Sequence, residues 1–225
     1  MTEPKLYCIL DLGYVHEAAA QRVAAALLAG GADLLQLRAK GHRLELIEAV
    51  ARRILPLCQA AGVPFILNDH PALAAALGAD GVHLGQDDGS LTEARALTGG
   101  AMLVGRSTHS LAQARTALAE GFDYIGFGPL FPTPTKAGRA AIGLDDLAAM
   151  ERDVGGRIPA FCIGGIHPGN LARVLAAGAR RVVMVSALLQ APDIQAATRA
   201  VAAAVAVAPS PQNANLPELP AGLIP

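Results

Sequence analysis

Short apolar runs alternate with amphipathic segments eight times along this chain of 225 residues. The expected strands are Lys5–Leu10, Leu34–Leu37, Pro64–Leu67, Gly81–Leu84, Met102–Gly105, Asp123–Phe127, Ala160–Ile163 and Arg181–Val185. The expected helices are Glu17–Ala29, Leu44–Ala61, Pro71–Leu77, Leu91–Leu97, Leu111–Glu120, Leu144–Arg152, Pro168–Ala177 and Asp193–Val207. Apolar runs without clean alternation are typical of strands buried on both faces, and eight such units predict an α/β fold, a closed (β/α)₈ TIM barrel. A doubly wound open sheet is the alternative, but no glycine-rich dinucleotide loop follows the first strand.

The boundaries of this domain follow from turn signals and from composition. Gly31-Ala32-Asp33, Gly78-Ala79-Asp80 and Gly178-Ala179-Arg180 each precede an expected strand, so we interpret them as matching helix-to-strand turns. The final segment, 209–225, is rich in Pro, Asn and Leu and carries one charge. We therefore expect one catalytic domain over residues 1–208 and a flexible C-terminal tail.

Net charge, apolar runs and cysteine positions indicate which kinds of partner and which compartment to expect. The formal net charge is -1, which favours neither a nucleic acid nor a membrane surface, and no apolar run reaches membrane-spanning length. Cys8, Cys58 and Cys162 lie far apart in apolar runs, with neither metal-ligand nor disulfide spacing. With a polar N-terminus that does not look like a signal peptide, this predicts a cytoplasmic protein. Its partners are expected to be small molecules, and a homo-oligomer is left open.

One loop is unusually stiff and polar. Gly126-Phe127-Gly128-Pro129-Leu130-Phe131-Pro132-Thr133-Pro134-Thr135-Lys136 follows the sixth expected strand. Glycine allows close backbone approach, and proline forbids helix. The loop then presents the hydroxyls of Thr133 and Thr135 and the ammonium of Lys136, which together suit an anionic, phosphorylated ligand. An ordinary turn is the alternative interpretation.

Active sites of such barrels lie at the carboxyl ends of the strands, and a cationic group follows the second one. Alternation places Gln36, Arg38 and Lys40 on one side of the chain. Two cations facing a barrel mouth are costly unless an anion is bound there. Lys136 and Ser107 are expected to converge on the same anion. The alternative is that Arg38 and Lys40 are solvated loop charges.

An acidic group follows the third and fourth strands. Asn68-Asp69-His70 ends one, and Gly85-Gln86-Asp87-Asp88 follows the next. One carboxylate from each strand can approach a shared point, and Mg²⁺ is usually held by one or two carboxylates plus substrate phosphate oxygens. Spacing alone does not choose between Asp87 and Asp88. A helix-capping role for Asp69 is the alternative.

A third, uncharged group follows strands seven and eight. Gly165 lies within Ile163-Gly164-Gly165-Ile166, and Ser186 follows Val185. Loops at these places form the usual phosphate site of barrels, although glycines also pack at barrel corners. Two anionic sites in one mouth, one with a metal, suggest a diphosphate beside a monophosphate. That layout indicates a transfer reaction in which pyrophosphate leaves.

The histidines are less informative. We interpret His83, within the fourth strand, as a core residue with satisfied hydrogen bonds. His109 follows the fifth strand and is either an acid–base group or a structural one. No Ser/His/Asp nucleophile arrangement is apparent.

Taken together, these motifs resemble the thiamine-phosphate synthase family. The matching stretches run in family order through Gln36–Lys40, Asn68-Asp69, Gly81–Asp88, Gly105–His109, Asp123–Lys136, Ile163–Ile166 and Val185-Ser186. The resemblance implies a (β/α)₈ barrel that joins hydroxymethylpyrimidine diphosphate to hydroxyethylthiazole phosphate, giving thiamine phosphate and pyrophosphate. It implies a dissociative reaction through a pyrimidine methyl cation, assisted by Mg²⁺.

The resemblance also implies residue roles. Asp69 and Asp88 would hold Mg²⁺, which selects Asp88 over Asp87 by analogy only. Arg38, Lys40, Asn68 and Lys136 would hold the diphosphate, Gln36 the pyrimidine side and Ser107 the pyrimidine diphosphate, with Arg38, Lys40, Ser107 and Lys136 as the catalytic set. Thr133, Thr135, Gly165, Val185 and Ser186 would hold the thiazole phosphate, the last two partly through backbone N–H groups.

His70 departs from the family pattern, in which an arginine commonly follows Asn-Asp. The departure bears on one diphosphate contact and not on the metal site. Two rival functions are a thiazole tautomerase, a related barrel without the diphosphate and metal groups, and a non-catalytic barrel that binds thiamine intermediates. The tautomerase is disfavoured by the presence of Arg38, Lys40, Asp69, Asp88 and Lys136. A sensor has no need to clamp a leaving group.

Overall fold

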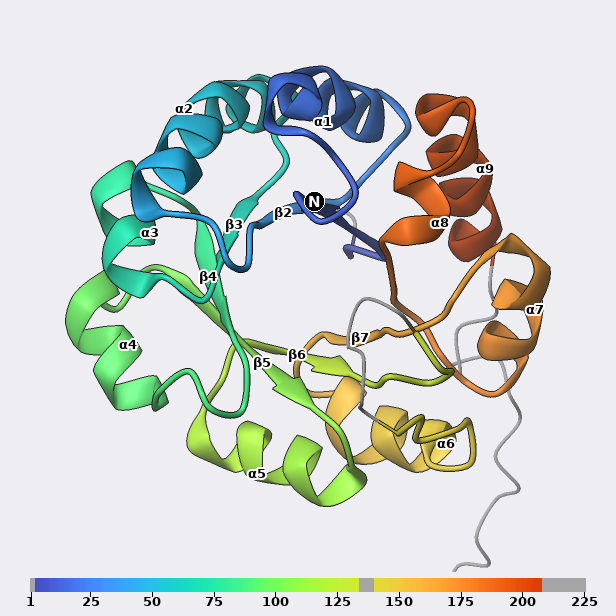
Figure 1. Ribbon diagram of the computed structural model, residues 1–225. Helices are drawn as coiled ribbons and strands as arrows, with labels where there is room; N and C mark the ends of the chain where they lie inside the picture. Colours follow the sequence, from blue (N-terminus) through green and yellow to red (C-terminus); the bar gives the residue numbers. More distant parts are fainter. Residues whose placement is uncertain (1–2, 134–139, 208–225) are drawn as a thin grey trace, which may run out of the picture.

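Eight parallel strands close into a barrel (Figure 1). They follow chain order, and β1 is hydrogen-bonded to both β2 and β8. This fold is that of a computed structural model, which describes residues 3–133 and 140–207. The strands are β1 Leu6–Asp11, β2 Leu34–Arg38, β3 Phe65–Asn68, β4 Gly81–Leu84, β5 Leu103–Thr108, β6 Tyr124–Phe127, β7 Ala160–Cys162 and β8 Val182–Met184. The closed barrel confirms the (β/α)₈ prediction and excludes the open sheet. The predicted tail, 209–225, lies outside the described residues.

The helices form a ring around the barrel (Figure 1). They are α1 Ala20–Ala29, α2 Leu44–Ala61, α3 Pro71–Leu77, α4 Leu91–Thr98, α5 Leu111–Glu120, α6 Leu147–Met150, α7 Pro168–Ala176, α8 Ser186–Leu189 and α9 Ile194–Ala206. The short α8 was not predicted, because four residues carry too little periodicity to detect. Among these described helices, none is both long and apolar enough to cross a bilayer.

The sixth helical segment differs most from the prediction of one helix over Leu144–Arg152. Here α6 is followed directly by a π-helix over Glu151–Gly155. A side chain at Gly155 would collide with the Glu151 carboxylate, so the wide turn and the glycine together make room for this buried acid. The periodicity of the sequence does not show this local widening.

Two apolar layers hold the barrel together. Side chains at alternate strand positions fill its interior, where Tyr7, Tyr124 and Phe161 contact one another edge-on. The intervening positions pack against the surrounding helices in a larger second layer. Both faces of every strand are therefore covered, which explains the unbroken apolar runs in the sequence. The three cysteines are buried free thiols, as expected.

At the amino ends of the strands, an aspartate side chain repeatedly accepts hydrogen bonds from the main chain of the neighbouring strand. Asp33 Oδ2 accepts hydrogen bonds from the main-chain N–H groups of Lys5 and Leu6, at 2.9 and 2.8 Å. Asp80 Oδ2 accepts one from Phe65 N–H at 2.8 Å. Each aspartate thus stands just before one strand and satisfies the start of the preceding one, which accounts for the aspartate in two of the three matching turns, Gly31-Ala32-Asp33 and Gly78-Ala79-Asp80.

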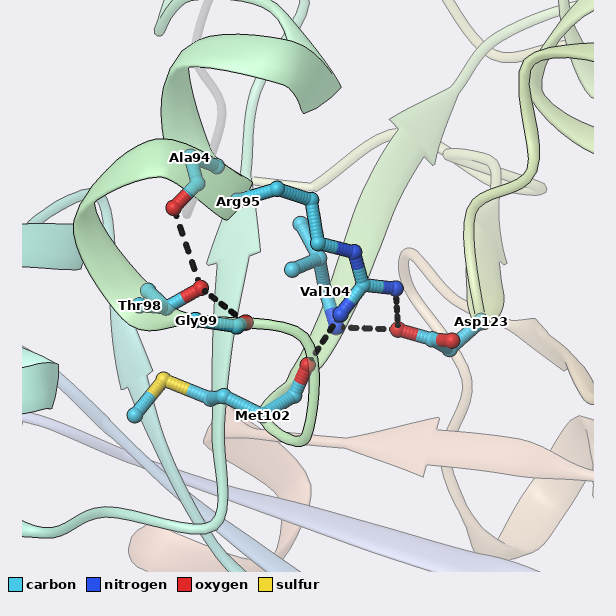
Figure 2. A network of polar contacts seen from close by, with 7 residues as sticks. All are labelled: Ala94, Arg95, Thr98, Gly99, Met102, Val104 and Asp123. Atoms are coloured by element: carbon cyan, nitrogen blue, oxygen red, sulfur yellow. Dashed lines mark hydrogen bonds and ion pairs between the residues drawn. The ribbon is translucent and has the colours of Figure 1, made fainter.

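Asp123 extends this pattern to β5 and β6 (Figure 2). Its Oδ2 accepts from Val104 N–H at 2.6 Å and from Arg95 Nη2 at 2.6 Å. Arg95 also donates through Nη1 to the carbonyl of Met102. These bonds lie at the opposite end of the barrel from the strand carboxyl ends, so they serve stability and leave the mouth to other residues.

Candidate active site

The strand carboxyl ends carry the polar side chains that the sequence singled out. Gln36 and Arg38 both lie on β2, and alternation turns them into the barrel with Leu34. Ser107 lies within β5, which runs to Thr108. The prediction that the fifth strand ends at Gly105 was therefore wrong. The second half of β5, Arg106–Thr108, is polar, and polar residues are uncommon in a buried strand. The apolar pattern therefore predicted an end that was three residues too early.

Arg38 is paired with a carboxylate that sequence reasoning missed. Its Nη1 lies 2.5 Å from Oδ2 of Asp11, and the side chains are 15% and 2% exposed, respectively. Asp11 ends β1 and shares the inward-facing positions of Tyr7 and Ile9. That alternation along the first strand was the available signal. The pair fixes Arg38 at the mouth and partly balances its charge.

Lys40 links the cationic group to the acidic group. Its Nζ lies 3.3 Å from Asp69 Oδ2, although the lysine side chain is half-exposed. Asp69 directly follows β3 and has φ of 67°, the only positive φ of a non-glycine residue in the described part of the chain. A left-handed backbone conformation is strained for a residue other than glycine, and residues in this conformation are found most often at functional sites. Arg38 is held inside the mouth by its ion pair with Asp11, so the alternative that it is a solvated loop charge is wrong.

Asp69 and Asp88 are close enough that each carboxyl shifts the pKa of the other. Burial, then the Asp88 carboxylate, raise the pKa of Asp69. Burial acts to raise the pKa of Asp88 too. The Asp69 carboxyl, the Gly85 N–H at 2.7 Å and the charges of Lys40 and Arg106 together outweigh burial and hold this pKa below its usual range. Asp87 is exposed. The structure thus brings together Asp69 and Asp88, while the N-cap of α3 is His70 and not Asp69.

A pocket at the ends of β6, β7 and β8 joins the residues of the third group. It is lined by Gly128, Pro129, Thr133, Ile163, Gly164, Gly165, Ile166, Val183, Val185 and Ser186. Gly165 has φ of 64°, and a Cβ there would stand 2.7 Å from Phe131 Cβ and 2.8 Å from Pro132 O. Thr133, Gly165, Val185 and Ser186 therefore meet in one place. Thr135 and Lys136 lie outside the described residues.

A hydrogen-bonded chain crosses the floor beneath the mouth. Gln36 Nε2 lies 2.6 Å from the Tyr7 hydroxyl, which is 3.2 Å from the Tyr124 hydroxyl. His83 Nδ1 lies 3.2 Å from that same hydroxyl, and His83 Nε2 lies 3.0 Å from Ser107 Oγ. All five side chains are buried, with Gln36 1% exposed. These contacts confirm His83 as a core residue with satisfied hydrogen bonds, and they add Tyr7 and Tyr124, which the sequence analysis did not single out.

The remaining predicted residues lie near these groups. Asn68 is buried at the end of β3. His109 is tethered, because its Nδ1 lies 2.5 Å from the carbonyl oxygen of Gly128 and its main-chain N–H donates to Gln113 Oε1 at 2.8 Å. His70 is half-buried beside Asp69. Cations, an acidic pair and a glycine-lined pocket therefore surround one barrel mouth, which is the arrangement of a (β/α)₈-barrel enzyme.

Comparison with known proteins identifies the family. Residues 6–188 match the family model described as thiamine monophosphate synthase. The chain is 50% identical to the thiamine-phosphate synthase of Thermus thermophilus over 84% of its own length and 89% of that protein's. It is 42% identical to the enzyme of the same name from Chloroflexus aurantiacus, covering 90% and 93% of the two chains. The solved structure of a thiamine phosphate pyrophosphorylase from Pyrococcus furiosus superimposes with a TM-score of 0.81 at 31% identity, covering 90% of this chain and 95% of that one. The chain belongs to the thiamine-phosphate synthase family and is a transferase of thiamine biosynthesis.

Proposed function

We propose that this barrel transfers the hydroxymethylpyrimidine group from its diphosphate to the nitrogen of hydroxyethylthiazole phosphate, by a dissociative route assisted by Mg²⁺. The observation that carries the proposal is the contact of Lys40 with Asp69, and of Asp69 with Asp88, in the same mouth as the glycine-lined pocket. A cation and two carboxylates suit a diphosphate with its metal, and the pocket suits a separate monophosphate.

The donor set fits Mg²⁺. Burial and the neighbouring Asp88 carboxylate raise the pKa of Asp69, and a bound divalent cation would stabilise both carboxylates in their charged form. No group of three or more Asp, Glu, His or Cys side chains gathers to hold a metal within residues 3–133 and 140–207. Two carboxylates are nevertheless enough, because Mg²⁺ takes its other ligands from substrate phosphate and water. Bound there, the ion would neutralise charge developing on the leaving diphosphate.

The side chains at β2 and β3 hold the diphosphate in this proposal. Arg38, oriented by Asp11, and Lys40 contact its oxygens, with Asn68 donating an amide hydrogen bond. Lys136 adds a further cation to the same group, as the family resemblance implies. As the C–O bond breaks, these cations stabilise the pyrophosphate that leaves with the bonding electron pair. Gln36 and Ser107 hold the pyrimidine ring while its methylene carbon is cationic.

The second substrate is placed by the pocket between β6 and β8. Thr133, Gly165, Val185 and Ser186 bind the thiazole phosphate through hydroxyl and backbone N–H groups, and Thr135 joins them. The thiazole nitrogen then donates its lone pair to the pyrimidine methylene carbon, forming the C–N bond. A reactive cation also requires exclusion of water, which the apolar lining of Ile163, Val183 and Val185 promotes.

Two further parts of the proposal concern the chain as a whole. The buried free thiols of Cys8, Cys58 and Cys162 favour a reducing compartment, the cytoplasm. Residues 1–208 form the catalytic domain in this proposal, and 209–225 form a C-terminal tail.

The test is pyrophosphate release from hydroxymethylpyrimidine diphosphate, measured with and without hydroxyethylthiazole phosphate and Mg²⁺. We expect release and thiamine phosphate formation only when all three are present. Isomerisation of a thiazole without pyrophosphate release would instead indicate the tautomerase. Tight binding of both phosphates without turnover would indicate the non-catalytic binding barrel. Either result would overturn the proposal.

A further inference from the structure

A buried series of side-chain hydrogen bonds runs from Gln36 to Ser107, the two residues proposed to bind the pyrimidine. Three core side chains, Tyr7, Tyr124 and His83, connect them. We propose that Tyr7, Tyr124 and His83 are positioning residues that fix the hydrogen-bond polarity of Gln36 and Ser107 toward the pyrimidine. This inference rests on the proposed function for its catalytic consequence. Its structural part, the direction of the hydrogen bonds, can be tested without turnover.

The direction of the chain follows from its first donor. The side-chain nitrogen of Gln36 can only donate, so the Tyr7 oxygen accepts from it at 2.6 Å. The Tyr7 hydroxyl hydrogen is then directed to the Tyr124 oxygen, 3.2 Å away. Tyr7 is 2% exposed and Tyr124 3%. A buried hydroxyl that did not donate would cost free energy, and this favours the arrangement in which each phenol donates onward.

The same logic sets the tautomer of His83. Tyr124 donates to His83 Nδ1 at 3.2 Å, so the neutral ring carries its proton on Nε2. Nε2–H then donates to Ser107 Oγ at 3.0 Å. Ser107 therefore acts as an acceptor toward His83, and its own hydroxyl hydrogen is directed away from the ring. Burial raises the pKa of both tyrosines, which keeps them protonated and able to donate at neutral pH.

The result is a fixed hydrogen-bond polarity at each end of the chain. Gln36 gives its amide nitrogen to Tyr7, so its amide oxygen is an acceptor on the other side of the amide group. Ser107 Oγ accepts from His83, so its hydroxyl can donate only in a direction away from the ring. A ring with an amino donor and a ring-nitrogen acceptor, such as an aminopyrimidine, complements this polarity. Reversing the chain would exchange the roles at Ser107 and misalign the ring. Hydrogen bonds in series also reinforce one another, so the pair acts as a unit.

The first test is ¹⁵N NMR of the histidine rings in the intact, ligand-free protein, with the His83 signal identified by its loss in His83→Gln. We expect a neutral ring protonated at Nε2. In Tyr124→Phe, which removes the donor to Nδ1, the population protonated at Nδ1 should rise. A wild-type ring protonated at Nδ1, or a tautomer unchanged in Tyr124→Phe, would overturn the inferred polarity whether or not the protein is a synthase.

The second test is steady-state kinetics of Tyr7→Phe and Tyr124→Phe, which keep the ring packing. We expect kcat/KM for the pyrimidine diphosphate to fall on the order of tenfold, because misplacement of reacting groups is costly, while KM for the thiazole phosphate stays unchanged. Phe161→Leu is the control, since Phe161 contacts both tyrosine rings but takes no part in the hydrogen-bonded chain. Equal losses in the control, or wild-type kinetics in both Phe variants, would overturn the positioning role. A wild-type protein without synthase turnover would overturn the proposed function and leave the NMR result standing.

Discussion

Asp11 Oδ2 lies 2.5 Å from Arg38 Nη1, at the carboxyl ends of two neighbouring strands inside the barrel. Asp11 also accepts a hydrogen bond from Gly13 N–H at 2.9 Å, so its carboxylate is fixed from two sides. A rigid carboxylate holds the guanidinium in one orientation, which removes part of the entropy cost of clamping a ligand. The same charge weakens the net positive field that a diphosphate meets.

Replacing Asp11 tests which of these effects is larger. We expect Asp11→Asn, which keeps the shape of the side chain, to lower kcat/KM for the pyrimidine diphosphate on the order of tenfold, because Arg38 loses its fixed orientation. Asp153→Asn is the matched control, since it removes an exposed ion pair with Arg115 outside the mouth. An increase in affinity for the diphosphate in Asp11→Asn would show instead that the carboxylate acts mainly by charge.

Asp69→Asn should remove metal-dependent turnover without unfolding the protein. Asparagine tolerates the positive φ at this position, whereas the substitution removes one of the two carboxylates proposed to hold Mg²⁺. We expect turnover at saturating substrate to fall by at least about 100-fold, and the Mg²⁺ concentration for half-maximal activity to rise. Asp87→Asn, one residue from Asp88 but exposed, should behave as wild type in the same titration. Wild-type Mg²⁺ dependence in Asp69→Asn would contradict the metal assignment.

The sequence was sufficient to predict the barrel and the positions of several polar side chains at its strand ends, because both depend on local signals. Alternation along β2 correctly placed Gln36 and Arg38 inside the barrel. The positions after β3 and β4 led to Asp69 and to a choice between Asp87 and Asp88, which only the family resemblance made. The partners of these residues could not be predicted in the same way. Asp11 and Tyr124 act through contacts 27 and 41 residues distant in the chain, to Arg38 and His83. Such contacts depend on barrel closure and register, which no single segment encodes.

Gly165→Ala should impair the thiazole phosphate subsite selectively. An added Cβ would meet Phe131 and Pro132 at less than ordinary contact distance, and φ of 64° is strained for alanine. Pushing the loop away from β7 should raise KM for the thiazole phosphate about tenfold or more, with KM for the diphosphate nearly unchanged.

Gly62→Ala is the control for Gly165→Ala in steady-state measurements of both KM values. Gly62 has φ of 65° at the C-terminal cap of α2, and a Cβ there meets nothing within 4 Å. Both variants should therefore lose comparable stability from the backbone alone, about 1 kcal/mol, but only Gly165→Ala should change substrate affinity. An equal rise of both KM values in Gly165→Ala would contradict the separation into two subsites.

Glu151 is buried at the amino-terminal side of the barrel and should make stability depend on pH. Its side chain is 5% exposed, and its Oε2 lies 3.6 Å from Arg180 Nε and 4.0 Å from Arg181 Nη1. Neither distance is a hydrogen bond, and Glu151 Oε2 is without a hydrogen-bond partner among the described residues. Burial raises the pKa of Glu151 from 4.5 to about 7, opposed by the Arg180 backbone N–H and the Arg180 charge.

The sign of the effect follows from proton binding. Between the unfolded pKa of 4.5 and the folded pKa of about 7, the folded protein binds more protons at Glu151 than the unfolded chain does. The free energy of unfolding therefore falls as the pH rises through this window, by up to about 3 kcal/mol from this group, and this contribution is flat above and below it. In Glu151→Gln, which cannot titrate but still accepts from Arg180 N–H, this loss should vanish. Urea unfolding of both proteins at pH 5 and pH 8 measures this fall in the free energy of unfolding. The difference between the two proteins isolates Glu151, because all other carboxyl groups are the same in both. Exposed Glu48→Gln serves as the control, and the same pH dependence in Glu151→Gln as in wild type would show that the buried carboxylate stays ionised beside its two arginines.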